Sequence, residues 1–254
     1  MVSSGTAGED EPVHNYFDGV VAETYDAGSP EMFAPETLGP TVDFLAGLAG
    51  DRPALEFAIG TGRVALPLSE RGVRVSGIEY SQAMADQLRA KPGSDRIDVT
   101  IGDMSTTRVD GEFGLVYLVF NTINNLLTQD AQVACFENAA AHLAPGGCFV
   151  VEVGVPILQR LPPGEVHRMF HHGEEHLGFD EYDVVTQRTF SHHYTFDGTS
   201  YRRSSVPFRY AWPAELDLMA RIAGMAQRER WGWWDRRPFT SDSAAHVSVW
   251  EKPA

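Results

Sequence analysis

The feature that most constrains the fold of this chain is an alternation of short apolar runs with helical stretches between residues 54 and 153. The apolar runs are Ala54–Ile59, Val73–Ile78, Ile97–Ile101, Leu115–Phe120 and Cys148–Val153. Helical spacing of apolar residues marks the intervening stretches Val64–Glu70, Ser81–Ala90 and Ala131–Leu143. Runs that are apolar on both faces and alternate with helices are typical of a buried parallel sheet. Because parallel crossovers are right-handed, the sequence predicts an α/β fold with a doubly wound sheet.

The segments that flank this alternation predict further elements. Apolar residues at helical spacing indicate a helix over Thr37–Ala49. After Pro156, the segments Val184–Phe196 and Tyr201–Tyr210 are rich in Thr, Tyr, Phe and Val. The turn signal Asp197-Gly198 lies between them, so the two segments are expected to form an antiparallel hairpin.

The last part of the chain predicts a return to the main sheet. Pro213 stands where a helix begins, and the apolar spacing continues to about Gly224. Two more strands, about Gln227–Trp234 and Ala245–Glu251, are expected to follow.

Charge and composition exclude several classes of partner. The 254 residues contain 35 acidic and 20 basic side chains, which gives a formal net charge of −15. Such a field repels phosphate backbones and anionic lipids, so we expect neither a nucleic acid nor a membrane as partner. No apolar run approaches the ~20 residues of a membrane helix. The two cysteines, Cys135 and Cys148, cannot build a disulfide framework, which favours a cytoplasmic location.

A glycine-rich turn follows the first apolar run. Gly60-Thr61-Gly62-Arg63-Val64-Ala65 fits the pattern G-x-G-x-x-G/A of dinucleotide-binding turns, and Glu79 follows 19 residues after Gly60. Glycines there let a ligand approach the main-chain N–H groups, and a carboxylate at the end of the second strand suits two ribose hydroxyls. The turn alone leaves NAD, FAD and S-adenosylmethionine open.

Glu56 helps to choose among these ligands. It lies inside the first apolar run, close to the loop where a dinucleotide would place its pyrophosphate. A carboxylate is unfavourable beside two phosphate charges and favourable beside the ammonium and sulfonium groups of S-adenosylmethionine.

Several motifs then carry a resemblance to a known family. Leu55–Arg63 resembles motif I of class I S-adenosylmethionine-dependent methyltransferases, usually E/D-x-G-x-G-x-G, with Ala58 in place of the first glycine. Gly77–Met84 is similar to the second strand and turn, whose acid holds the ribose. Ile101–Met104 resembles the third-strand motif, in which an acid binds the adenine amino group and the next residue packs on the ring.

The resemblance extends over about Tyr25–Gly154, since Phe113–Val116 and Leu143–Gly147 resemble the fourth-strand motif and the turn before strand five. It implies a Rossmann-like, seven-stranded sheet whose last strand is antiparallel, and methyl transfer from S-adenosylmethionine. The residues that the resemblance and the motifs assign to the cofactor are Tyr16, Tyr25, Glu56, Ala58, Gly60, Gly62, Arg63, Glu79, Tyr80, Met84, Gly102, Asp103, Met104, Phe120 and Asn121.

Bacterial small-molecule methyltransferases of natural-product biosynthesis, including those that methylate sugar amines, are the nearest group that the sequence resembles. On this reading, residues 1–12 are a disordered tail. Residues 13–155 form the cofactor-binding core with N-terminal lid helices, 156–210 an inserted antiparallel β lid over the substrate, and 211–254 the end of the core. A homodimer is left open.

The acceptor side of the site is less defined. No N/D-P-P-Y/F motif and no Pro-Cys nucleophile follow the fourth strand, which argues against nucleic acid as the acceptor. Asn121, Asn124 and Asn125 could orient a polar acceptor or cap a helix start.

Six of the nine histidines lie within Val166–His193, on what we expect to be a loop and a strand. A histidine can take a proton from an attacking nucleophile, although a solvated surface role is open for each of them. His193 and Tyr25 are taken as candidate catalytic residues. Tyr194 and Arg209 join Asn124 and Asn125 as candidate substrate contacts, and no metal is expected.

The leading hypothesis is therefore an S-adenosylmethionine-dependent methyltransferase that acts on nitrogen or oxygen of a small polar metabolite. One alternative is an NAD(P)-dependent oxidoreductase on a related fold, against which Glu56 and Asp103 argue. The other is a non-catalytic binder of S-adenosylmethionine, against which the intact motif set argues.

Overall fold

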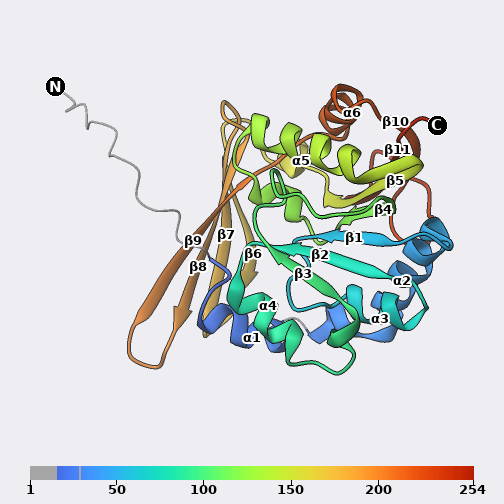
Figure 1. The fold of residues 1–254 in the computed structure, drawn as a ribbon. Coiled ribbons are helices and arrows are strands. Elements are labelled where there is room, and N and C mark those ends of the chain that lie inside the picture. Colours follow the sequence, from blue (N-terminus) through green and yellow to red (C-terminus); the bar gives the residue numbers. More distant parts are fainter. Residues whose placement is uncertain (1–15, 29) are drawn as a thin grey trace.

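The computed structural model describes residues 16–28 and 30–254, and two sheets organise this part of the chain (Figure 1). The larger sheet has seven strands in the order β10-β11-β5-β4-β1-β2-β3. These strands are β1 (Ala54–Phe57), β2 (Val75–Glu79), β3 (Asp98–Ile101), β4 (Phe113–Leu118), β5 (Leu143–Gly154), β10 (Ala226–Trp231) and β11 (Ala245–Glu251). The expected tail of residues 1–12 lies outside the described residues.

The direction of the strands confirms the predicted fold class. β1, β2, β3, β4 and β5 pair in parallel, whereas β11 is antiparallel to both of its neighbours, β5 and β10. The strand order reverses between β1 and β4, because the chain adds β2 and β3 on one side and β4 and β5 on the other. Ligands of doubly wound sheets bind outside the carboxyl ends of the strands at such a reversal.

Helices cover both faces of this sheet (Figure 1). The helices are α1 (Val20–Gly28), α2 (Pro35–Ala49), α3 (Ala65–Glu70), α4 (Gln82–Arg89), α5 (Gln129–His142) and α6 (Pro213–Ile222). One core cluster packs α5 and α6 against the sheet, and a second cluster packs α2, α3 and α4 against the opposite face. All residues of β1 and β4 are buried, which explains why both strands are apolar runs rather than alternating ones.

Short 3-10 helices complete the connections. They are η1 (Pro30–Phe33), η2 (Ser94–Arg96), η3 (Thr122–Asn125) and η4 (Ile157–Arg160). Within the described residues, no helix has the length and the apolar character that crossing a membrane requires.

The second sheet is antiparallel and has the order β6-β7-β8-β9. Its strands are β6 (His167–His172), β7 (His176–Asp183), β8 (Arg188–Phe196) and β9 (Tyr201–Arg209). The hairpin expected around Asp197-Gly198 is confirmed: Gly198 has a φ of +90°, and the Asp197 carboxylate accepts the N–H groups of Thr199 and Ser200. In Figure 1 this sheet stands beside the larger one.

Two expectations for this region were wrong. Most of the histidine-rich segment was expected to be a loop, but β6 and β7 form a hairpin there. β6 is exposed along its whole length and rich in polar side chains, so it lacks the apolar alternation that marks a strand. The strand expected from Val184 begins only at Arg188, because residues 184–187 turn the chain and the Asp183 carboxylate accepts the Val185 N–H and the Thr186 hydroxyl.

Candidate cofactor and acceptor site

The turn between β1 and α3 is built from residues with left-handed backbone. Gly60 has a φ of +58° and Gly62 a φ of +80°, values that favour glycine. Ala58, which stands where the motif has a glycine, also has a positive φ of +51° and is therefore strained. The Gly60 N–H donates to Glu79 Oε2 at 2.8 Å.

Glu79 ends β2 and ties two turns together. Its Oε2 accepts the Gly60 N–H, and its Oε1 accepts the Ser81 N–H at 2.8 Å. Burial raises the pKa of this carboxyl above its usual range, although the backbone N–H groups of Ser81, Gly60 and Tyr80 oppose the shift. Each oxygen keeps a second lone pair, so the carboxylate can accept further hydrogen bonds from a ligand.

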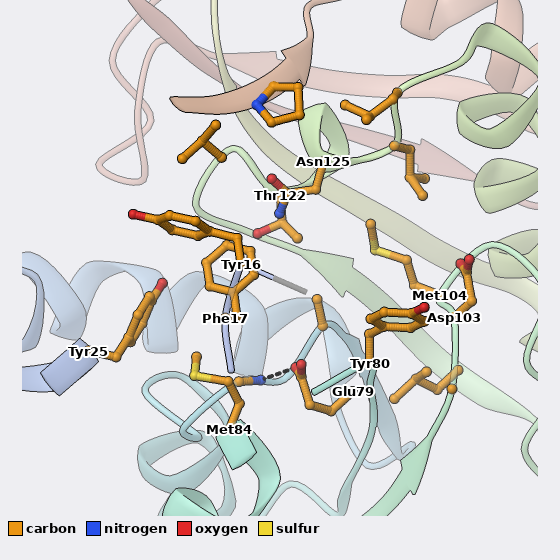
Figure 2. A pocket seen from close by; sticks show the side chains of 18 residues that line it. Tyr16, Phe17, Tyr25, Glu79, Tyr80, Met84, Asp103, Met104, Thr122 and Asn125 are labelled. Atoms are coloured by element: carbon orange, nitrogen blue, oxygen red, sulfur yellow. Dashed lines mark hydrogen bonds between the residues drawn. The ribbon is translucent and has the colours of Figure 1, made fainter. Parts of the chain in front are cut away.

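A cavity of about 380 Å³ opens beside Glu79, at the carboxyl ends of β1, β2 and β3. Figure 2 shows Glu79 and Met84 on one side of it, Thr122 and Asn125 of η3 on the opposite side, and Tyr25 far from Asp103. The lining residues are Tyr16, Phe17, Tyr25, Ala58, Gly60, Ile78, Glu79, Tyr80, Met84, Gly102, Asp103, Met104, Thr122, Asn125, Leu126, Leu127, Val206 and Pro207.

Asp103 keeps one carboxylate oxygen available to this cavity. Its Oδ1 accepts both the Ser105 N–H at 2.7 Å and the Ser105 hydroxyl at 2.6 Å, which fixes the side chain. Gly102 precedes it, and a Cβ there would lie 2.1 Å from Thr107 Oγ1. Glycine is therefore required by packing at this position, and the close approach holds Asp103 at the cavity wall.

A smaller cavity adjoins the first and is lined by Glu56, Arg63 and Phe120, with Tyr25, Ala58, Gly60 and Thr122 shared between the two. Glu56 Oε2 accepts the Tyr117 hydroxyl at 2.8 Å. Burial raises the pKa of Glu56 to about 8, because desolvation outweighs the Tyr117 hydrogen bond and the Arg63 charge. The Arg63 guanidinium lies 5.2 Å from the centre of the Phe120 ring.

The N-terminal segment closes one side of both cavities. Tyr16 and Phe17 line the larger cavity, and Tyr25 of α1 lines both. Asp26, one residue further, accepts the Thr61 hydroxyl at 2.6 Å and pairs with Lys91 at 2.5 Å. These contacts attach the segment to the glycine-rich turn.

Most of the fifteen residues assigned to the cofactor lie at the two cavities, and two do not. Gly62 faces Leu88, since a Cβ on it would lie 2.9 Å from that side chain, so packing requires glycine there. Asn121 Oδ1 accepts the Gly154 N–H at 2.6 Å, so its side chain supports the turn.

Of the residues expected to contact the acceptor, some line the larger cavity and others lie outside it. Asn125 lines the larger cavity, but Asn124 does not, and its buried Oδ1 has no hydrogen-bond partner within the described chain. His193 and Tyr194 lie on β8 outside both cavities. His193 Nδ1 lies 3.0 Å from His176 Nε2, and burial, followed by the His176 charge, lowers the pKa of His193.

Arg209 lies outside both cavities. We expected it to hold the substrate, but it is buried, and its guanidinium donates to Glu215 Oε1 at 2.6 Å, to Gln187 Oε1 at 3.3 Å and to Gln132 Oε1. These partners come from α6, from the turn between β7 and β8, and from α5, in that order. Arg209 therefore ties β9 to the helices α5 and α6, and it lines neither cavity.

Some lining residues were not singled out in the sequence, namely Phe17, Ile78, Thr122, Leu126, Leu127, Val206 and Pro207. Thr122 adjoins the polar asparagine run and could have been found from it. Val206 and Pro207 lie on β9, where nothing in the local pattern separates them from ordinary strand residues. No cluster of His, Cys, Asp and Glu in the described residues has an arrangement that could hold a metal ion.

A buried carboxylate at a sheet reversal, a glycine-rich turn and an elongated cavity define a nucleoside-binding α/β protein. A family model described as a methyltransferase domain matches residues 54–147. The chain is 36% identical to the CcbJ methyltransferase from Streptomyces caelestis, with a TM-score of 0.80 over 92% of this chain and 96% of that one. This chain belongs to the S-adenosylmethionine-dependent methyltransferases.

Two further relatives agree with this assignment. The cypemycin N-terminal methyltransferase of a Streptomyces species is 26% identical over 93% of this chain and 97% of its own length. CalS10 from Micromonospora echinaspora, an amino pentose methyltransferase of calicheamicin biosynthesis with S-adenosylmethionine bound, is 22% identical. Its TM-score is 0.67, over 94% of this chain and 99% of that one, which shows a shared fold. The cofactor of this enzyme is S-adenosylmethionine.

Proposed function

We propose that the enzyme methylates an amine nitrogen of a small metabolite in secondary metabolism. The observation that carries the proposal is the chemistry of the larger cavity. Its titratable side chains within the described residues are three tyrosines (Tyr16, Tyr25 and Tyr80) and two carboxylates (Glu79 and Asp103). A neutral amine carries its own lone pair and needs no base before it attacks, whereas a hydroxyl group needs one.

We place the cofactor across the two cavities. Glu79 would accept the ribose hydroxyls, the second oxygen of Asp103 would accept the adenine amino group, and Tyr80 and Met104 would cover the adenine ring. Glu56 and Arg63 would receive the ammonium and carboxylate of the amino-acid end. The donor set fits this cofactor, because acids face its cationic and hydroxyl groups and the one cation in the smaller cavity can face its carboxylate.

In this arrangement the protein acts by positioning. The bound cofactor supplies an electrophilic methyl group on a sulfonium. Tyr16 and Phe17 exclude water on one side, and Val206 and Pro207 of β9 close the other side over the acceptor. Aligning the two reactants and excluding water from them accounts for most of the rate enhancement of such a displacement.

Glu56 is the strongest candidate for a base, since its pKa of about 8 suits one. It lies inside β1, accepts the Tyr117 hydroxyl and lines only the smaller cavity, where we place the amino-acid end. We therefore assign it to the cofactor. We also propose a division of labour: residues 13–155 and 211–254 hold the cofactor, and 156–210 cover the acceptor.

Two relatives support nitrogen as the nucleophile. The cypemycin enzyme is named for an amino terminus, and CalS10 is described as an amino pentose methyltransferase. Both names also refer to natural products, which supports a role in secondary metabolism.

The test is a panel of matched acceptors. Amino sugars, peptides with a free amino terminus and phenols would each be paired with the analogue that carries the other nucleophile at the same position. Release of S-adenosylhomocysteine and the mass of the product would be measured with methyl-labelled cofactor. We expect methylated amines, with a rate that rises as pH approaches the amine pKa. Methylation of the hydroxyl member alone would overturn the proposal.

A further inference from the structure

Two consecutive residues after β4 have left-handed backbone without being glycine. Phe120 has a φ of +60° and Asn121 a φ of +61°. Asparagine tolerates this region, but a bulky aromatic residue there is uncommon. Such strain persists only where the surrounding structure holds it, and it concentrates at functional sites.

Three contacts from the end of β5 hold this turn. Glu152 Oε2 accepts the Phe120 N–H at 2.7 Å, and the Glu152 carbonyl accepts the Asn121 N–H at 3.2 Å. In return, Asn121 Oδ1 accepts the Gly154 N–H at 2.6 Å. The turn is therefore fastened to the neighbouring strand through one buried carboxylate and one amide. We name these contacts the β5 clamp.

The carboxylate of the clamp is unfavourable for stability alone. Glu152 is only 4% exposed and makes no ion pair within the part of the chain that the structure describes. Burial raises its pKa, although the Phe120 N–H and the Arg63 charge oppose the shift. A buried carboxylate without an ion pair costs desolvation energy, so an apolar residue would suit the sheet better.

The clamped turn lies where the two cavities meet. Phe120 lines the smaller cavity and lies under the Arg63 guanidinium, and Thr122 lines both cavities. With the adenosine in the larger cavity and the amino-acid end in the smaller one, the methylsulfonium group falls at this junction. The turn then sets the distance and orientation of the residues that contact the transferred group.

We propose that Glu152 is a positioning residue for methyl transfer, which acts with Asn121 to hold the strained turn of Phe120 against the methylsulfonium group. This inference rests on the proposed placement of S-adenosylmethionine across the two cavities, and it is independent of the acceptor. It requires that the clamp affects the charged, methylated end of the cofactor more than its adenosine.

The experiment compares two ligands that differ at the sulfur. Calorimetric affinities for S-adenosylmethionine and for S-adenosylhomocysteine, which lacks the methyl group and its charge, would be measured on Glu152→Met and Glu152→Gln. Methionine removes the acceptor for the Phe120 N–H at similar length, whereas glutamine keeps an oxygen. For Glu152→Met we expect about a tenfold loss of affinity for S-adenosylmethionine and at most about a threefold loss for S-adenosylhomocysteine. Glu152→Gln should restore the parent ratio.

Val150→Ala is the matched control, because Val150 is buried, lies two residues earlier on the same face of β5 and pairs with Tyr117 of β4. It should lower the melting temperature without changing the ratio of the two affinities. If Glu152→Met does not fold, Asn121→Gly tests the same clamp, since glycine keeps the left-handed backbone and loses the contact to Gly154. It should shift the ratio in the same direction.

Hydrogen exchange supplies a second measurement. The Phe120 and Asn121 amide protons should exchange faster in Glu152→Met than in Val150→Ala at equal stability. Equal losses of affinity for both ligands, or an unchanged ratio, would overturn the clamp. Binding of neither ligand by the parent protein would instead overturn the placement of the cofactor.

Discussion

The two sheets of this enzyme use polar residues in opposite ways. In the inner strands β1, β2, β4 and β5 of the seven-stranded sheet, most residues are apolar and buried, and the buried acids of these strands (Glu56, Glu79 and Glu152) lie at the cavities or at the turn between them. In the four-stranded sheet, polar and aromatic residues occupy most positions, and β6 is exposed throughout. A buried acid in the inner strands of the larger sheet therefore marks the ligand site, whereas a polar residue in the four-stranded sheet does not indicate a site.

Arg209 gives the largest expected effect and separates stability from ligand binding. Arg209→Ala removes a buried guanidinium and leaves the partly buried Glu215 without its ion partner, and breaking a buried pair of this kind costs up to about 3–5 kcal/mol. We expect a lower free energy of unfolding in denaturant titrations, with unchanged affinity for S-adenosylmethionine in the folded fraction.

The matched control for this change is Arg202→Ala, on the same strand but exposed. It should leave stability within about 0.5 kcal/mol of the parent. A specific loss of cofactor affinity in Arg209→Ala would break the distinction between the two sheets.

Glu79 tests a residue of the larger sheet that we expect to affect cofactor binding. Glu79→Ala removes the acceptor of the Gly60 and Ser81 N–H groups and, on our placement, of the ribose hydroxyls. Loss of hydrogen bonds to a charged group should reduce cofactor affinity by about 1.5–3 kcal/mol, measured by calorimetry. An affinity equal to that of the parent would remove Glu79 from the site.

The comparison also explains what could be predicted from sequence. The parallel sheet was predictable because each strand is a short apolar run, and Glu56 and Glu79 were noticed as acids within or at the end of such runs. Glu152 carries the same signal, an acid inside the run Cys148–Val153, and was missed because that run precedes no glycine-rich turn. Most residues of the proposed cofactor site could therefore be predicted from local sequence patterns.

The acceptor side was predicted less well for a physical reason. Whether an arginine on a β-strand meets a substrate or a buried acid depends on residues distant in sequence, and Arg209 bonds Gln132, 77 residues away. The stacked pair His176 and His193 is likewise defined by strand register, not by spacing. Neither relation is visible in one strand alone.

The protonation of Glu56 should make the affinity for the cofactor depend on pH. With a pKa of about 8, Glu56 is mostly protonated in the free protein at pH 7. A cationic ligand favours the carboxylate, so binding should release a proton, and affinity should rise as pH increases from 6 to about 7.5, by up to about tenfold per unit. Calorimetry in two buffers of different ionisation enthalpy measures the proton count.

In Glu56→Gln the neutral amide cannot release a proton, so the pH slope should fall by as much as one proton. Tyr117→Phe is the companion variant, because it removes the hydroxyl that Glu56 accepts and should raise the pKa of the carboxyl further. If the parent and Glu56→Gln release equal numbers of protons, Glu56 does not face the cofactor.

Ala58 gives the smallest expected effect and tests whether strain in the first sheet always serves the site. Ala58 has a φ of +51° where the motif has glycine, and glycine adopts this conformation without a Cβ clash. Ala58→Gly should therefore raise the free energy of unfolding by about 0.5–1 kcal/mol, since relief of strain exceeds the added entropy of the unfolded chain. Because the backbone is unchanged and only one methyl group leaves the wall that the two cavities share, cofactor affinity should change little. The contrast with Phe120 is direct: its strain is held by Glu152 and Asn121, whereas no side chain is hydrogen-bonded to the Ala58 backbone among the contacts of the described residues. A loss of affinity in Ala58→Gly would mean that the methyl group of Ala58 contacts the cofactor, and both strained positions would then belong to the site.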